Sequence, residues 1–147
     1  MDKDFEIIPH TADLKIRVYG RSLQELFEHA LIGMFQAMKP IAPGCSYEKD
    51  RLVCPALPII RDIGVNSPDV NALLVDFLSN ALYLCDVHKE IYLDVTITTF
   101  TQTSIFAQVH GVHITGLQES EVKAVTYHDL AIMQKDGVWQ TDIVFDI

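Results

Sequence analysis

The spacing of the apolar residues changes abruptly near position 89. From Val70 to Leu84, apolar side chains recur every three or four residues, which is the period of an amphipathic helix. From Glu90 to Thr98 they alternate with polar side chains, which is the period of a strand with one buried face. Each element has to bury its apolar face against another, so this switch predicts a fold in which helices and sheet share one core.

An earlier helix is predicted after Ser22. Ser22 and Glu25 have the spacing of a capping box, in which side chains satisfy the free N–H groups of the first turn. Apolar residues then recur at helical spacing as far as Phe35. Because Pro40 cannot continue a helix, we expect the end near Lys39.

The second helix is predicted to begin at Ser67-Pro68-Asp69. Ser67 suits the N-cap, Pro68 suits the first helical position, and Asp69 meets the positive end of the helix dipole. The apolar face of this helix predicts an end near His88.

The rest of the chain is predicted to be mostly strands. Between residues 41 and 67, prolines and glycines interrupt one apolar run, and we expect loops with one or two strands. Asp136-Gly137 is a hairpin turn signal. The expected strands cover residues 5–8, 14–18, 90–98, 104–114, 121–128, 130–133 and 138–147.

These elements predict one α+β domain over residues 1–147. Two helices stand among six or more mostly antiparallel strands, without a regular alternation of strand and helix. We expect a two-layer sandwich or half-open barrel with both helices packed on one face. A chain of 147 residues with 49% hydrophobic content suits a single core.

The charge balance argues against direct nucleic-acid binding. Eleven basic and twenty acidic residues give a formal charge of −9, which repels a phosphate backbone. The basic residues are scattered singly rather than clustered. Polar residues interrupt every apolar run before about 18 positions, and the N-terminus does not resemble a signal peptide. We therefore expect a cytoplasmic protein without a membrane segment.

The cysteines and one histidine pair carry no clear ligand pattern. Cys45, Cys54 and Cys85 are odd in number and lack Cys-x-x-Cys spacing, so we expect reduced, packing thiols. His110 and His113 would point to opposite faces of a strand, which disfavours a shared metal. We expect ordinary surface or turn histidines.

Three carboxylates could meet at one end of the sheet. Asp13 follows Pro9 at a bend between two predicted strands, where a turn residue bonded to its own backbone is the alternative. Asp146 lies next to Ile147, whose α-carboxylate ends the last predicted strand. Ca²⁺, Mg²⁺ and Mn²⁺ take oxygen ligands of this kind. A solvated acidic sheet edge is the alternative to a metal site.

Three sequence motifs resemble those of the archease family. The first is Pro-His-Thr-Ala-Asp-Leu at residues 9–14, followed by Ser-Leu-Gln-Glu-Leu-Phe at residues 22–27. The second is Ala-Leu-Leu-Val-Asp-Phe-Leu at residues 72–78 with Tyr-Leu at 83–84. The third is Glu-Val-Lys-Ala-Val-Thr-Tyr-His at residues 121–128 with the terminal Phe-Asp-Ile. The resemblance covers nearly the whole chain, in order.

The resemblance implies a divalent metal ion, described in that family as calcium, with Mg²⁺ or Mn²⁺ as alternatives. The implied ligands are Asp13, Asp146 and the α-carboxylate of Ile147. His10 and His128 lie in the same blocks, and each either borders this site or is a satisfied packed imidazole. Lys123 is either a partner of one of the acids or a solvated strand residue.

The resemblance also implies a function without catalysis. Archeases activate the RNA-splicing ligase that joins a 2′,3′-cyclic phosphate or 3′-phosphate end to a 5′-hydroxyl end in tRNA splicing and RNA repair. They promote its GTP-dependent guanylylation and its multiple turnover. A chaperone-like modulator of an RNA-modifying enzyme is one alternative. A metal-dependent hydrolase with His10 or His128 as general base is another.

The second motif departs at one point from the sequence that is usual in the family. Residues 79–81 read Ser-Asn-Ala where an acidic residue is usual, which puts the partner-facing surface around the second helix in doubt. The sequence leaves a homo-oligomer open.

Overall fold

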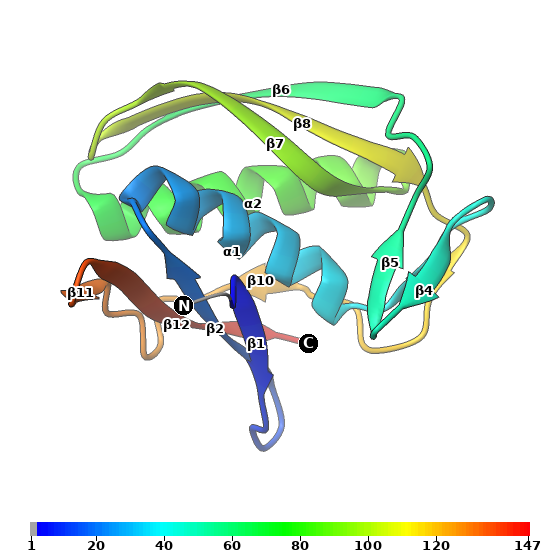
Figure 1. Ribbon diagram of the computed structural model, residues 1–147, viewed down its shortest axis with the longest axis horizontal. Helices are drawn as coiled ribbons and strands as arrows, with labels where there is room; N and C mark the ends of the chain where they lie inside the picture. Colours follow the sequence, from blue (N-terminus) through cyan, green and yellow to red (C-terminus); the bar gives the residue numbers. More distant parts are fainter. Residues whose placement is uncertain (1–2) are drawn as a thin grey trace.

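Two helices lie between two antiparallel sheets in the computed structural model, which describes residues 3–147 (Figure 1). One sheet has three strands and the other has five. The predicted α+β class with two helices and mostly antiparallel strands is confirmed. The helices are covered on two sides by these sheets and pack as an inner layer, in place of the expected packing of both helices on one face.

The helices are α1 (Leu23–Ala37) and α2 (Val70–His88). The strands are β1 (Phe5–Ile8), β2 (Leu14–Gly20), β3 (Pro40–Ile41), β4 (Ser46–Glu48), β5 (Arg51–Val53), β6 (Ile59–Asn66), β7 (Glu90–Phe100), β8 (Ser104–His113), β9 (Gly116–Leu117), β10 (Ala124–Val125), β11 (Met133–Lys135) and β12 (Val138–Asp146). The five-stranded sheet has the order β1-β2-β12-β10, with β11 also paired to β12. The three-stranded sheet has the order β6-β8-β7. Two further two-stranded sheets, β3-β9 and β4-β5, complete the set among the described residues.

The first helix begins as predicted. Ser22 is its N-cap, and the Ser22 hydroxyl accepts a hydrogen bond of 3.0 Å from the Glu25 N–H group. The Glu25 carboxylate in turn accepts 3.0 Å from the Arg21 N–H group. The last helical residue is Ala37, two residues before the predicted end.

The second helix begins two residues later than predicted. Its N-cap is Asp69, whose carboxylate accepts a hydrogen bond of 2.8 Å from the Ala72 N–H group. The predicted N-cap, Ser67, instead donates to the Asp76 carboxylate at 2.7 Å, so it ties the preceding loop to the helix. The prediction was wrong because Ser and Asp are similarly good caps and both precede the apolar run.

The predicted hairpins are confirmed, with shorter strands in the last part of the chain. β7 and β8 pair as one long hairpin. The residues 121–128 that alternate in the sequence pair only at Ala124–Val125, and the strand expected at 130–133 lies at Met133–Lys135. Asp136 and Gly137 both have positive φ, of 54° and 77°, as the predicted tight turn requires.

Aromatic residues from both helices and from β7 pack against one another within the core. The ring of Phe27 lies 6.0 Å from that of Phe77 and 5.0 Å from that of Phe100. The rings of Phe35 and Tyr92 are 5.4 Å apart, edge to face. These contacts join α1 to α2 and to the three-stranded sheet, so the inner layer is held by large apolar side chains.

Within residues 3–147, α2 is the one helix long and apolar enough to cross a membrane by length and composition. Most of its apolar residues are packed in the fold, and Leu73, Leu74, Phe77 and Leu78 have no exposed surface. The core helix of a globular domain passes the same test of length and composition. α2 therefore serves as a core helix here.

The structure contradicts the prediction of free thiols at two positions. Cys45 and Cys54 form a disulfide, with their Cα atoms 4.4 Å apart. β4 and β5 form a hairpin in which Ser46 lies opposite Val53, so the residues that flank this pair face each other. Spacing along the chain does not reveal such a cross-strand pair, and the prediction failed for that reason. Cys85 is free and buried, as predicted.

Reduction of the Cys45–Cys54 bond is expected to lower the free energy of unfolding by about 2–3 kcal/mol, because it frees a loop of about ten residues in the unfolded chain. Urea denaturation with and without dithiothreitol measures this difference. The double variant Cys45→Ser/Cys54→Ser is the control, and its midpoint should not respond to the reductant. An equal response of parent and double variant would contradict a stabilising role for this bond.

Candidate functional site

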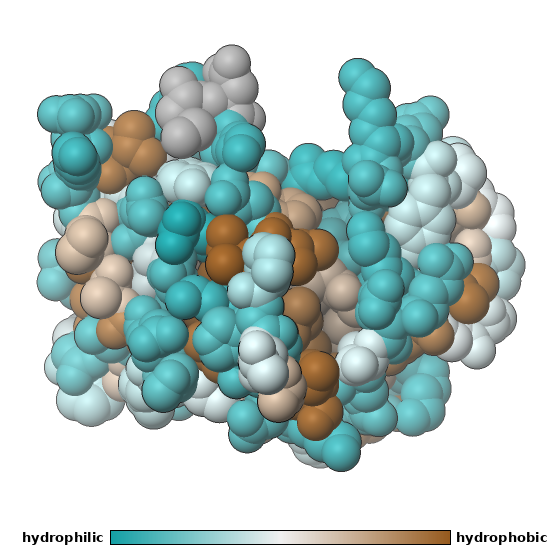
Figure 2. Space-filling view, turned by 90° about the horizontal axis from the view of Figure 1, so that it is seen from below, coloured by the Kyte–Doolittle hydropathy of each residue, from teal (hydrophilic) through white to brown (hydrophobic). Residues whose placement is uncertain are grey.

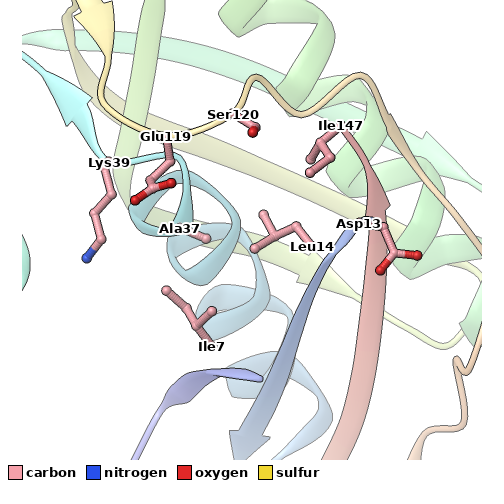
Figure 3. A pocket seen from close by; sticks show the side chains of 8 residues that line it. All are labelled: Ile7, Asp13, Leu14, Ala37, Lys39, Glu119, Ser120 and Ile147. Carbon is pink, nitrogen blue, oxygen red and sulfur yellow. The ribbon is translucent and has the colours of Figure 1, made fainter. Parts of the chain in front are cut away.

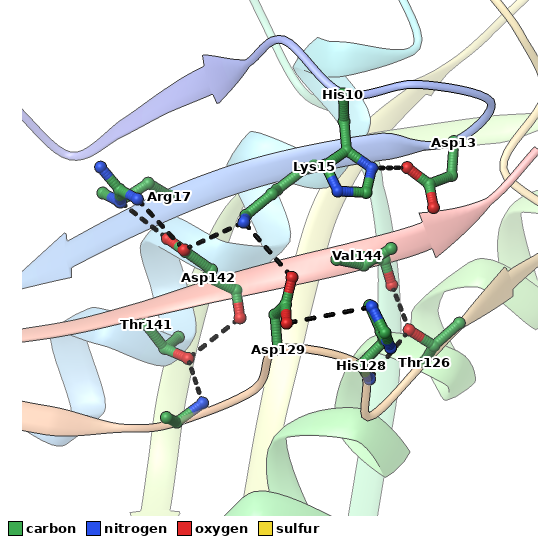
Figure 4. A network of polar contacts seen from close by, with 11 residues as sticks. His10, Asp13, Lys15, Arg17, Thr126, His128, Asp129, Thr141, Asp142 and Val144 are labelled. Atoms are coloured by element: carbon green, nitrogen blue, oxygen red, sulfur yellow. Dashed lines mark hydrogen bonds and ion pairs between the residues drawn. The ribbon is translucent and has the colours of Figure 1, made fainter.

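The turn between β1 and β2 is organised by a contact between two side chains. The Nδ1 atom of His10 contacts the carboxylate of Asp13 across the turn (Figure 4). Ala12 has a φ of 68°, in the left-handed region that residues other than glycine rarely adopt. Such strain is concentrated at functional sites, so the backbone and the sequence point to the same turn.

The same end of the sheet contains the last residues of the chain. β2 and β12 pair antiparallel, and their last registered pair is Leu14 with Phe145. Asp13 precedes Leu14 in the chain and Asp146 follows Phe145, so both residues lie directly beyond this pair. On its other side β12 pairs with β10, where the Lys123 N–H group donates to the Asp146 carbonyl at 2.7 Å. The register thus brings two residues 133 positions apart in sequence to the same end of the sheet.

A cavity of about 280 Å³ lies beside this end of the sheet (Figure 3). Asp13 and Ile147 both contribute to its wall, but the Asp13 carboxylate points away from the middle of the cavity. Lys39 and Glu119 place one positive and one negative charge at its other end. The lining residues are Ile7, Asp13, Leu14, Ala37, Lys39, Glu119, Ser120 and Ile147.

A network of charged side chains covers the outer face of the same sheet (Figure 4). Arg17 donates two hydrogen bonds to Asp142, at 2.7 and 3.1 Å. Lys15 lies 3.4 Å from both Asp142 and Asp129. The hydrogen bonds from Arg17 lower the pKa of the Asp142 carboxyl. Hydrophilic residues cover most of this side of the molecule and surround smaller hydrophobic patches (Figure 2).

His128 and Lys123 have different surroundings, and neither side chain contacts a predicted metal ligand among the described residues. His128 lies 3.9 Å from Asp129, and its backbone N–H group donates to the Thr126 hydroxyl at 3.2 Å. Lys123 is exposed, and no ion pair of its side chain is found within residues 3–147. Of the two histidines, His10 is the one whose side chain contacts a predicted ligand.

The donors at this end of the sheet suit a hard cation but form an incomplete set. No group of three or more His, Cys, Asp or Glu side chains within residues 3–147 is arranged to hold a metal ion. Asp13 and Asp146 supply anionic oxygens, and the α-carboxylate of Ile147 would be the third donor. Ca²⁺ takes six to eight oxygen ligands, so water or a partner would complete the shell. The chemistry of these donors thus suits a hard cation, and the described residues do not form a complete site by themselves.

Sequence reasoning missed the pairing of Arg17 with Asp142 and the position of Lys39 in the cavity wall. The alternation of Lys15 and Arg17 with apolar residues showed that both lie on one face of a strand. It did not show which strand would lie beside them. Lys39 has a φ of 51° and follows α1, where sequence reasoning assigned only a helix end.

Comparison with known proteins identifies the family. The model of the Archease protein family matches residues 5–147. The chain belongs to the archease family. Its relatives include the archease of Methanosarcina barkeri, 33% identical over 155 aligned positions that cover 99% of this chain and 97% of that protein. The Pyrococcus abyssi archease is 31% identical over 152 positions, covering 99% of both chains.

Two solved structures share the fold of this archease family member. The solution structure of Methanobacterium thermoautotrophicum protein 1598 has a TM-score of 0.68 and 24% identity, over 98% of this chain and 99% of that one. The crystal structure of a Thermotoga maritima archease, described as a possible chaperone, has a TM-score of 0.63 and 18% identity, over 95% and 94%. The predicted family resemblance is thus confirmed by sequence, and the predicted fold by structure.

Proposed function

We propose that the protein is a non-catalytic activator of an RNA-splicing ligase in the cytoplasm. Its partner would join a 2′,3′-cyclic phosphate or 3′-phosphate end to a 5′-hydroxyl end, and the protein would promote guanylylation of the ligase by GTP and its multiple turnover. Membership of the archease family supports this role. The observation that carries it is the β2–β12 register, which places Asp13 and Asp146 directly beyond its last pair, Leu14 with Phe145.

In this proposal Asp13, Asp146 and the α-carboxylate of Ile147 hold a divalent ion, Ca²⁺, Mg²⁺ or Mn²⁺, at the surface. The ion would offer the partner its open coordination positions, and His10 would orient the Asp13 carboxylate through their contact. The formal charge of −9 favours approach to a basic, RNA-binding surface of the ligase over contact with the RNA itself.

A chaperone-like role is the second candidate, because the Thermotoga maritima relative is described as a possible chaperone. The two roles differ in what the partner gains. An activator increases the rate of a reaction step in a folded ligase, whereas a chaperone-like protein preserves the amount of folded ligase and leaves the rate per active molecule unchanged.

Addition of the protein at substoichiometric ratio to a ligase, GTP and Mn²⁺ is expected to increase both the guanylylation rate and the number of ligations per ligase molecule. The labelled guanylylated ligase is quantified over time, and active ligase is titrated in parallel. Heat-denatured protein is the control. A flat response with a ligase shown to be competent would contradict the activator role. An increase in the amount of active ligase, with an unchanged rate per active molecule, would favour the chaperone-like role.

A further inference from the structure

The two edges of the three-stranded sheet differ in regularity. β8 is the central strand, so β6 and β7 each have one edge without a strand partner within residues 3–147. The β7–β8 pairing is interrupted twice, between Tyr92 and Asp94 and between Ile97 and Thr99. Bulges of this kind twist an edge away from further strands. The β7 edge is therefore protected against the addition of another strand.

The β6 edge lacks this protection. β6 pairs with β8 over eight consecutive residues, from Ile59 to Asn66, without a register shift. It contains no proline. A regular edge of this length presents free backbone N–H and C=O groups at alternate residues, which is the template for adding an extended segment.

A groove lies between this edge and α2, which runs beside β6 (Figure 1). Its volume is about 480 Å³. The strand contributes Gly64, Val65 and Asn66, and the helix contributes Asp76, Ser79, Asn80 and Tyr83.

Apolar side chains are exposed on both sides of the edge. Tyr83 is 65% exposed on the groove side. On the other side Ile60 is 54% exposed, and Phe106, 42% exposed, lies over Gly64 in the space that a Cβ atom would fill. Successive side chains of an added strand would point alternately toward these two surfaces. An extended segment could thus bury apolar surface on both sides of β6.

The charges of this surface select a basic occupant. Asp76 lies in the groove, and Asp62 lies on the strand itself. No lysine or arginine lines the groove, and the one cation of β6, Arg61, is already paired with Glu90 at 2.8 Å. A second copy of this chain would bring a further charge of −9, which repels the first.

We propose that the β6 edge and the adjoining α2 face bind an extended, basic segment of a partner protein, which adds to the sheet as a fourth strand. This surface lies on the three-stranded sheet and shares no residue with the Asp13–Asp146 site, so the inference does not depend on the proposed function. It gives the protein a point of attachment to a partner on this sheet.

The first test uses a ten-residue peptide of alternating valine and lysine, with blocked ends, and follows backbone amides by NMR and hydrogen exchange. We expect slower exchange at alternate residues of β6 and shifted signals in residues 76–83. The matched valine–glutamate peptide should bind at least tenfold more weakly. Protection elsewhere, or equal binding of the two peptides, would overturn the proposal.

Backbone methylation distinguishes strand addition from simple attraction of charge. Two versions of the valine–lysine peptide are compared. One is N-methylated at the odd-numbered residues and the other at the even-numbered residues. Only the set whose N–H groups face β6 is needed for pairing, so one peptide should lose binding and the other should keep it. Equal binding of both peptides would overturn the proposal.

Two variants test the groove. Tyr83→Ala is expected to weaken binding at least fivefold, and Asp76→Asn about threefold, while the asparagine oxygen still accepts from Ser67. Met133→Ala, which removes an exposed apolar side chain on β11, is the control and should bind as the parent does. Peptide-free protection of β6 that grows with protein concentration, together with a dimer in sedimentation, would assign the edge to a second copy instead.

Discussion

Replacement of Arg61 by methionine is expected to lower the free energy of unfolding measurably at neutral pH. Arg61 donates two hydrogen bonds to the Glu90 carboxylate, at 3.0 and 2.8 Å. Glu90 is only 1% exposed, so the variant leaves a buried carboxylate with the Tyr92 hydroxyl as its remaining partner. Removing one partner of such a pair is destabilising because the other charge is left without compensation, and the 35% exposure of the Arg61 side chain moderates the loss.

The pH dependence identifies the cause. Hydrogen bonds from Arg61 lower the pKa of Glu90 below its ordinary value, so in the parent this group adds stability above that value and loses it as the pH falls. In the variant, burial without a cation raises the pKa of Glu90 instead. The difference between parent and variant should therefore be largest at neutral pH and should shrink under acid conditions.

Urea denaturation from pH 3 to pH 8 measures this difference. The double variant Arg61→Met/Glu90→Met is the control, because it removes both charges and should recover most of the lost stability. A constant difference across the pH range, or a double variant less stable than Arg61→Met, would contradict a stabilising ion pair.

Local patterns predicted most of this fold, and contacts between distant residues account for the errors. The capping box of Ser22 and the turn at Asp136-Gly137 depend on neighbours in sequence, and both were predicted. The Cys45–Cys54 bond and the pairing of Arg61 with Glu90 depend on strand register, which no local pattern encodes. The layer of helices between two sheets has the same origin, since alternation shows that a strand has a buried face but not which face covers it.

The candidate site shows the same division. The residues around Asp13 stood out because a proline and a carboxylate interrupt two strand patterns. That Asp13 and Asp146 could belong to one end of the sheet was one of two alternatives from the residues alone, and the family resemblance favoured it; the β2–β12 register brings them there. The contact of His10 with Asp13 spans three residues, and the turn that contains it holds Ala12 at a positive φ.

Substitution of Asp13 or Asp146 by asparagine is expected to weaken Ca²⁺ or Mn²⁺ binding by well over tenfold and to abolish ligase activation. Each change removes one of three anionic donors. Unit charges about 4 Å apart at an effective dielectric near 20 interact by roughly 4 kcal/mol, which is enough for that loss. The fold should survive, because Asp146 is exposed and Asp13 lies at a turn.

Calorimetric titration with each ion measures the affinity, and circular dichroism confirms folding. The control is Asp129→Asn, which removes the same charge from the same face of the sheet but from outside the proposed ligand set. A general effect of charge would weaken binding equally in all three variants. Only a coordinating role predicts that Asp129→Asn keeps the parent affinity while Asp13→Asn and Asp146→Asn lose it.

The α-carboxylate of Ile147 can be tested separately, because the Ile147 side chain cannot bind a metal. A C-terminal tag converts this carboxylate to an amide carbonyl, which leaves a neutral oxygen where the proposal needs an anion. The tagged protein is expected to fold, since Ile143 and Phe145 stay buried in β12 and the strand keeps its pairing with β2. It should bind metal weakly and activate poorly, whereas an N-terminally tagged protein should match the parent in both assays. Equal affinity of the two tagged forms would remove the terminal carboxylate from the site, and Asp13 and Asp146 would then require their third ligand from water or from the ligase.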